Sequence, residues 1–252
     1  MKRTLTSLIL SSCIAVAAFA QAGPPKASDT MTALPSTDQI LDKYVQALGG
    51  KAALEKITST ASKGTFEIAA VGASGSAEIW EKAPNKTALR LDIPGFGLVL
   101  DGFNGTVGWS QDPQSGLREK TGVELATARR DADFYKPLKL KLLFTKITVK
   151  GKEKLGDKDA YVLVATPAEG APETWYFDAE SGLLARLDIE RETPQGKMAV
   201  QVFQEDYKDV GGIKVPHTVR QVTSAFTIVI KLDEVKQNVA VDDTKFNKPA
   251  AQ

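Results

Sequence analysis

The chain has 252 residues, of which 42% are hydrophobic and 25% are charged, and its formal net charge is +1. These values are ordinary for a globular protein, and they exclude disordered, collagen-like and coiled-coil chains. Because 32 basic residues face 31 acidic ones, the chain has no charge excess for binding nucleic acid and no basic block for a membrane surface.

The first residues have the layout of a secretory signal peptide. A basic start at residues 1–3 is followed by an apolar run over residues 5–20 and then by polar residues. Small residues favour cleavage after Ala20, which predicts removal of residues 1–20 and export across the inner membrane into a bacterial periplasm. A lipoprotein anchored through Cys13 is the alternative. No later run is long and apolar enough to predict a transmembrane segment in the mature protein.

The mature chain would be poor in reactive side chains. Removal of 20 residues from 252 leaves 232, with 30 basic and 31 acidic side chains and no cysteine, which excludes thiol catalysis, disulfides and cysteine-ligated zinc. The chain has a single histidine, His217, and no Gly-x-Ser-x-Gly motif that would supply a nucleophilic serine for it to activate. Adjacent aspartates at 131 and 133, 157 and 159, and 242 and 243 are typical of solvated charges. We therefore predict a protein that is not an enzyme and has no cofactor and no metal site.

The remaining chain is expected to form one domain. Residues 21–35 are rich in Pro, Ala, Ser and Thr and predict a flexible leader, residues 36–246 predict the folded domain, and residues 247–252 predict a tail. Helices are expected in two places, near the start of the domain and in its middle.

Three helices are predicted from spacing and capping residues. Ser36 followed by Gln39 is a capping box, and the helix that it opens should stop at the glycine pair 49–50. A short second helix is expected over residues 51–57. A second capping box, Thr121 with Glu124, predicts a helix to about Phe134.

Elsewhere the hydrophobic period is two residues, which is typical of strands with one wet face. About ten or eleven antiparallel strands are expected, joined by hairpins such as Gly211-Gly212, where both residues need a positive φ. The predicted fold class is therefore mainly β with a few helices: a large curved antiparallel sheet forming an incomplete β-barrel, with helices covering the concave face.

So few helices cover so wide a sheet incompletely, so either the sheet curls tightly around its own side chains or a gap between sheet and helices remains as an apolar cavity. Aromatic and branched residues on the predicted strands are candidates for its lining, although the parity of Trp80 opposes that of its neighbour Ile79. The predicted ligand-binding residues are Phe66, Ile68, Trp80, Leu89, Leu91, Leu98, Leu100, Trp109 and Phe226.

Several motifs occur in an order that resembles a known family. They are IWEKAPN at residues 79–85, an Asp-Gly pair at 101–102 ahead of Trp109, and two hairpin segments at 176–184 and 206–216. In this order they resemble the periplasmic outer-membrane lipoprotein carrier and sorting superfamily, the LolA-like and LolB-like proteins. The resemblance spans most of residues 36–246.

The resemblance implies an incomplete barrel closed by helices, with a hydrophobic cavity that accepts acyl chains. Carriers of this kind place an arginine where this chain has Ala83. The leading hypothesis is a periplasmic carrier or binding protein for lipids or lipoprotein acyl chains. The alternative is an envelope sensor module that engages a protein partner and carries no lipid. A hydrolase that uses unidentified carboxylates is a third hypothesis.

Overall fold

The computed structural model describes residues 33–193 and 196–250. The chain divides into two compact units, residues 1–33 and 34–252, and the fold given below is that of the second. The predicted signal peptide, Cys13 and nearly all of the predicted leader lie outside the described residues, as do positions 194 and 195 of one predicted turn.

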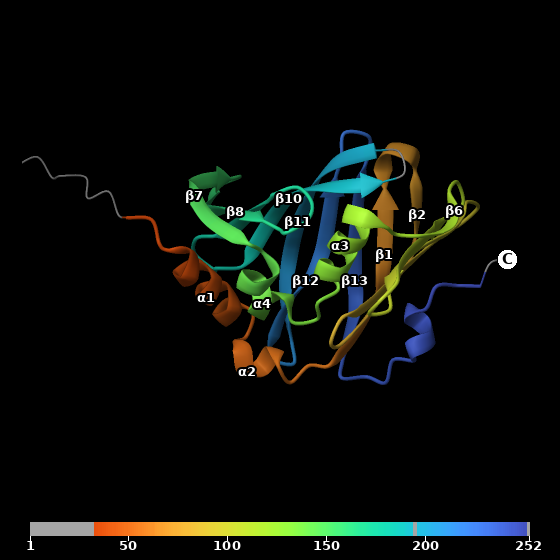
Figure 1. Cartoon of the computed structure of the whole chain (residues 1–252), viewed down its shortest axis with the longest axis horizontal. Helices are drawn as coiled ribbons and strands as arrows, with labels where there is room; N and C mark the ends of the chain where they lie inside the picture. The colour runs from red at the N-terminus through yellow and green to blue at the C-terminus, as the bar shows by residue number, and fades with distance from the viewer. Residues whose placement is uncertain (1–32, 194–195, 251–252) are drawn as a thin grey trace, which may run out of the picture. The chain divides into compact units, whose positions relative to one another are not determined.

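Thirteen strands form one antiparallel sheet with the order β6-β5-β4-β3-β2-β1-β13-β12-β11-β10-β9-β8-β7, so the first and last strands pair at its centre (Figure 1). The strands are β1 (Ser59–Ile68), β2 (Ala73–Lys82), β3 (Lys86–Ile93), β4 (Gly97–Phe103), β5 (Gly108–Asp112), β6 (Gly116–Glu119), β7 (Lys146–Leu155), β8 (Lys158–Thr166), β9 (Glu173–Asp178), β10 (Leu184–Thr193), β11 (Gly196–Val210), β12 (Ile213–Val222) and β13 (Thr227–Gln237).

The predicted fold class is confirmed, with more strands than expected. β6 has only four residues, too few to display an alternating pattern. The hairpin between β11 and β12 is confirmed, because Gly211 and Gly212 have φ of 59° and 85°, conformations that glycine adopts without strain.

The helices are α1 (Thr37–Ala47), α2 (Lys51–Leu54), α3 (Gly122–Asp131) and α4 (Lys136–Leu143), with short 3₁₀ turns η1 (Ala69–Val71) and η2 (Asp243–Phe246). The first predicted capping box is confirmed: Gln39 N donates to Ser36 Oγ over 3.2 Å, and Ser36 N donates to Gln39 Oε1 over 2.8 Å. The sequence predicted no helix at α4.

The second predicted capping box is wrong in its chemistry. Thr121 is the N-cap of α3, but its side chain makes no capping hydrogen bond. Glu124 instead forms a two-bond ion pair with Arg118 of β6, with lengths of 2.7 and 2.6 Å. The carboxylate prefers a guanidinium that matches its two oxygens over a single backbone N–H, so the pair ties α3 to the edge of the sheet.

The main core lies between α1, α4 and the strands β7 to β10. Its centre is aromatic: the rings of Phe144 and Trp175 meet edge to face with centroids 4.8 Å apart, and Trp175 meets Phe177 at 6.3 Å. Tyr44 of α1 completes the stack on Phe177 at 5.1 Å. Large aromatic side chains bury much area with few rotatable bonds, so this core anchors the helices to the concave face.

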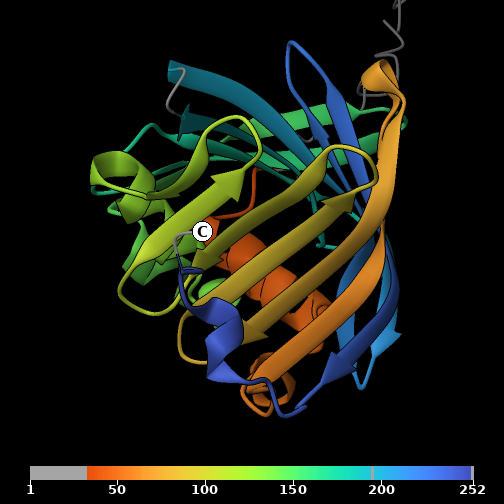
Figure 2. The same cartoon turned by 90° about the vertical axis from the view of Figure 1, so that its right-hand side faces the viewer.

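A second, smaller core lies on the opposite face of strands β2 to β5. There η2 and the segment before it cover the sheet, whereas α1 is seen behind the same strands (Figure 2). Trp109 Nε1 donates to the Phe246 carbonyl over 2.9 Å. Gly102 permits this packing, because a Cβ there would lie 2.5 Å from the Trp109 ring. The C-terminal segment is thus part of the fold.

Candidate ligand-binding site

The strand register divides the predicted lining residues between the two faces of the sheet. Leu91 pairs with Ala77 and Val99, and Phe66 pairs with Ile230, and all five belong to one apolar cluster. Because side chains alternate along a strand, Phe66, Ile68, Leu89 and Leu91 share this face. The helix α3 covers the same face, since Leu125 lies against Gly108 there.

Four predicted residues lie on the other face, which corrects the expectation that all nine line one cavity. Leu98 pairs with Asp92 and Leu100 pairs with Arg90, one position out of step with Leu91. Trp80 pairs with Ala88, Ala88 with Gly102, and Gly102 with Trp109. This cross-strand row places both tryptophans on the face that the C-terminal segment covers. These four residues, Trp80, Leu98, Leu100 and Trp109, therefore face away from the concave side.

Phe226 also differs from its predicted position on a strand. It lies in the β12–β13 turn, where its carbonyl accepts a hydrogen bond of 2.9 Å from Thr223 N. The Thr223 hydroxyl accepts from Phe226 N over 3.0 Å and closes the same turn. β13 therefore begins at Thr227, one residue after Phe226, which the turn keeps outside the strand pairing.

The concave face is only partly covered. Its cluster has a buried centre around Phe66 and Leu91, and a margin of side chains that keep part of their surface accessible to solvent. The margin residues are Ile68, Ala73, Leu89, Val99, Ile228 and Leu232. An apolar surface is therefore partly open over β1 to β4 and β13; of the four predicted residues on this face, Ile68 and Leu89 lie at its margin, and Phe66 and Leu91 are buried in its centre.

An apolar pocket of about 130 Å³ lies between the sheet and the helices at one end of this face. Its floor comes from the central strands β12, β13, β1 and β2, and its roof from α2 and the chain around the start of α4 (Figure 1). The lining residues are Leu54, Ile57, Thr60, Glu81, Phe134, Tyr135, Pro137, Leu138, Ile213, Val215 and Gln237. None of the nine residues predicted from sequence lines it.

Hydrogen bonds hold the pocket's roof in place. Tyr135 Oη donates to the Ile57 carbonyl over 3.0 Å, and Phe134 N donates to the Pro84 carbonyl over 2.9 Å. At the floor, Thr60 Oγ1 donates to Glu81 Oε2 over 2.7 Å. The hydroxyls of Thr60 and Tyr135 and the carboxylate of Glu81 are thus engaged in hydrogen bonds, and most of the lining left for a ligand is apolar.

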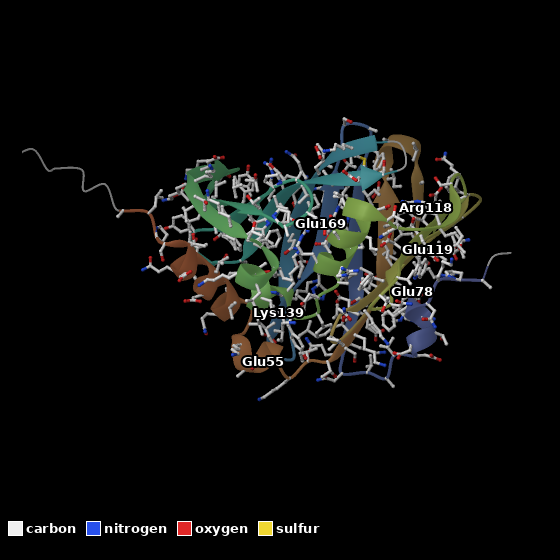
Figure 3. The ribbon with its side chains drawn as sticks, viewed as in Figure 1. Glu55, Glu78, Arg118, Glu119, Lys139 and Glu169 are labelled. Atoms are coloured by element: carbon white, nitrogen blue, oxygen red, sulfur yellow. The ribbon has the colours of Figure 1, made fainter. Side chains whose placement is uncertain are left out.

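A larger groove lies on the outer side of the roof, between α1, α2 and α4. It has a volume of about 820 Å³ and is flanked by Glu55 and Lys139, which are labelled in Figure 3. Tyr135 and Leu138 line both the groove and the pocket. These two side chains form the wall between the pocket and the surface groove.

Charged side chains lie next to the pocket's roof, where α3 and the start of α4 meet β10. Asp131, at the end of α3, contacts Lys136 over 2.7 Å and Arg191 of β10 over 2.6 Å. Burial acts to raise the pKa of the Asp131 carboxyl, but the charges and hydrogen bonds of Lys136 and Arg191 outweigh it and hold that pKa well below its usual range. One carboxylate therefore pins α3, α4 and the sheet together.

The other candidates for chemistry are paired in similar ways. Asp133 pairs with Lys139, Asp159 with Lys152 and Lys154, and Asp243 with Lys82 and Lys86. His217 is buried with Nδ1 3.0 Å from the Val215 carbonyl. Within residues 33–193 and 196–250, no group of three His, Cys, Asp or Glu side chains is arranged to hold a metal ion.

The Asp131 contacts predict an acid-dependent stability. A carboxyl whose pKa is depressed on folding contributes stability above its unfolded-state value, about 4, and loses that contribution as the pH falls through the folded value. Asp131→Asn should lower the free energy of unfolding by about 1–3 kcal/mol at pH 7, with the difference from wild type shrinking below about pH 4. Urea unfolding across pH 3–7 measures this, with Asp233→Asn, at an exposed position of β13, as control; a constant difference would contradict it.

No family model matches the chain, and no curated protein matches it. Among solved structures, a DUF1329 family protein from Desulfovibrio piger aligns with a TM-score of 0.59 at 16% identity, over 85% of this chain and 98% of that one. A LolA superfamily protein from Nitrosomonas europaea aligns with a TM-score of 0.55 at 13% identity, over 85% of this chain and 99% of that one. The chain has a LolA-like fold.

A third structure agrees with this assignment. A putative outer membrane lipoprotein-sorting protein domain from Vibrio parahaemolyticus aligns with a TM-score of 0.54 at 12% identity, over 82% of this chain and 96% of that one. The LolA-like fold inferred from the motif order is thereby confirmed. In the described part of the chain, every helix is too short or too polar to cross a membrane.

The sequence missed the pocket because it missed α4, whose start forms part of the roof. Residues 136–143 read KPLKLKLL, an alternation that suggests a strand, yet they form α4. The usable signal was Pro137, since proline is favoured in the first turn of a helix, where its missing N–H costs nothing. Leu140 and Phe144, four residues apart, then fall on one buried side.

Proposed function

We propose that this protein is a non-catalytic carrier or binding protein that holds the acyl chain of a lipid or lipoprotein. The observation that carries the proposal is the apolar pocket between the central strands and the helical roof. An apolar cavity of about 150 Å³ holds a benzene-sized group, so a pocket of 130 Å³ suits the end of one acyl chain. The function is assigned to residues 36–246.

The open concave face would take the rest of the chain. Its margin residues include Leu89 and Val99 on the neighbouring strands β3 and β4, and Leu232 on β13 beyond β2 and β1. Each methylene buried there contributes about 0.8 kcal/mol, so ten methylenes supply about 8 kcal/mol before the costs of ordering. Affinity of this origin depends on chain length and hardly on salt.

Two further observations support the proposal. Two of the similar structures are named for the LolA superfamily and for outer membrane lipoprotein sorting. The predicted signal peptide over residues 1–20 agrees with work in the periplasm, where such carriers meet their cargo. Because this chain has Ala83 where the carriers have an arginine, the function proposed here is general binding of acyl chains and not specifically the shuttling of lipoproteins.

Native mass spectrometry of the protein recovered from a bacterial periplasm tests the proposal directly. We expect a bound species whose mass matches a lipid or an acylated peptide, and uptake of added fatty acid by any ligand-free fraction. Protein that is consistently free of ligand and takes up no fatty acid would overturn the proposal. Co-purification of a protein partner with ligand-free protein would favour the sensor alternative.

Filling the pocket should abolish binding of a fluorescent fatty acid. Val215→Trp places an indole at the pocket floor, where it competes with the acyl chain, and we expect at least a tenfold loss of affinity. Thr218→Trp is the matched control, since it adds the same group to the opposite face of β12. Equal affinities for the two variants would contradict the assignment of the pocket.

A second variant tests the pocket even if Val215→Trp fails to fold. Leu138→Ala removes side-chain volume from the wall shared by pocket and groove, so it should retain the fatty acid and release it faster. Circular dichroism at the temperature of the binding assay verifies that each variant is folded.

A further inference from the structure

Three neighbouring hairpins end at the same end of the sheet. They are the β1–β2, β3–β4 and β12–β13 turns, and the strands that carry them are adjacent in the order β4-β3-β2-β1-β13-β12 (Figure 2). The pocket lies at the opposite end, where Ile213 follows the β11–β12 turn. We call residues 68–77, 93–100 and 221–230 together the hairpin tip.

The hairpin tip contains no charged residue. None of its three segments has an Asp, Glu, Lys or Arg, in a chain of which 25% of residues are charged. Charged residues border every segment: Glu67 and Glu78, Asp92 and Asp101, and Arg220 and Lys231. The β5–β6 and β10–β11 hairpins at the same end carry Asp112, and Glu192 and Lys197, so the uncharged stretch is confined to the hairpin tip. Exposed turns normally carry charge, so three adjacent uncharged hairpins indicate a surface that meets an apolar phase.

Two large apolar side chains protrude from the hairpin tip. Val71 is 72% exposed at the end of η1, and Phe96 is 50% exposed in the β3–β4 turn. Gly72, with φ of 63°, closes η1 directly after Val71, and Gly95 and Gly97 flank Phe96. Small residues around each side chain leave it free of neighbours that would cover it, and exposed alanines lie beside Val71.

We propose that the hairpin tip binds the surface of a lipid bilayer. Protein interfaces need about 800 Å² from each partner and usually include charged or bidentate groups at their rim, whereas this tip offers three separate turns, two of which carry one exposed large side chain. The lipid–water interface accepts such turns, because apolar side chains enter the acyl boundary while hydroxyls and turn backbone stay among the headgroups.

The hairpin tip is continuous with the concave face. Ile68 ends β1 and Ile93 ends β3, and both belong to the concave apolar cluster. A lipid that leaves the bilayer at Val71 and Phe96 would therefore meet apolar side chains all the way into the concave face. This inference goes beyond the proposed function, since it states where the protein meets a membrane.

Flotation with phosphatidylcholine vesicles tests the inference on protein recovered from the periplasm. Wild-type protein should float with the vesicles at low and high salt alike, because apolar insertion is not screened. Val71→Glu with Phe96→Glu should reduce the bound fraction at least tenfold. Leu142→Glu, which alters an 84% exposed leucine on α4, is the matched control and should float like wild type.

Each other outcome overturns the inference. Wild-type protein that fails to float, floats only with anionic vesicles at low salt, or floats equally well with the double substitution would exclude apolar docking through the tip. Capture of a protein partner that is lost only in the tip variant, without flotation, would do the same. Uptake of fluorescent fatty acid in solution should be unchanged in the tip variant, which separates failure of docking from failure of the proposed function.

Discussion

Replacing Arg130 by methionine should lower the free energy of unfolding by about 3–5 kcal/mol. Arg130 on α3 and Glu173 on β9 form a buried ion pair, with side chains only 9% and 6% exposed and Nη2 3.0 Å from Oε1. Glu173 Oε2 also accepts from Trp175 Nε1 over 2.9 Å, and the guanidinium lies over the Phe144 ring. Arg130→Met would leave a carboxylate without its cation inside the aromatic core.

The double variant Arg130→Met with Glu173→Gln isolates the cause. Glutamine keeps an oxygen to accept from Trp175 and removes the stranded charge, so most of the lost stability should return. Urea unfolding at neutral pH measures all three proteins. If the double variant were no more stable than Arg130→Met, lost packing of the arginine stem on Phe144 would be the cause, and the charge argument would fail.

Phe246→Ala should cost about 3–5 kcal/mol, the usual range for a buried phenylalanine. The Phe246 side chain is fully buried beside Ala88 and Val241, and its carbonyl accepts from Trp109. Loss of the ring loosens the C-terminal segment, so Trp109 should become more accessible to acrylamide quenching. Thermal unfolding and quenching of tryptophan fluorescence measure the two effects.

A control close in sequence is Lys248→Ala. Lys248 Nζ contacts Glu119 Oε1 over 2.6 Å at the surface, and an exposed pair of this kind contributes less than about 1 kcal/mol. Should Phe246→Ala change stability as little as Lys248→Ala, the segment would not pack on the sheet in solution. Because Phe246 lies on the face opposite the concave side, the folded variant should keep its affinity for fatty acid.

Much of the fold could be predicted because its signals are local. The Ser36 capping box, the two glycines at 211–212 and the period-two strands each act over a few residues, and each appears in the structure. The exception at α4 has a cause that is not local. Residues 136–143 alternate like a strand and form a helix, since the buried contacts of Leu140 and Phe144 decide their conformation.

The site could be predicted only in part, because the face of the sheet on which a side chain lies depends on how neighbouring strands pair. Residues 98–100 read Leu-Val-Leu, so either parity looks like an apolar face; pairing of Val99 with Leu91 turns both leucines outward. The pocket joins residues such as Leu54, Phe134 and Val215, which come from distant parts of the chain. Nothing in their local sequence indicates that they meet.

The pairing of the first strand with the last sets how this protein must fold. Thr60 pairs with Gln237 and Phe66 with Ile230, so the central ladder joins opposite ends of the domain. Each half can form its own hairpins early, but the pocket floor, which spans β12, β13, β1 and β2, forms only when β13 pairs with β1. Long-range pairing of this kind slows folding, so we expect the pocket to form late in folding.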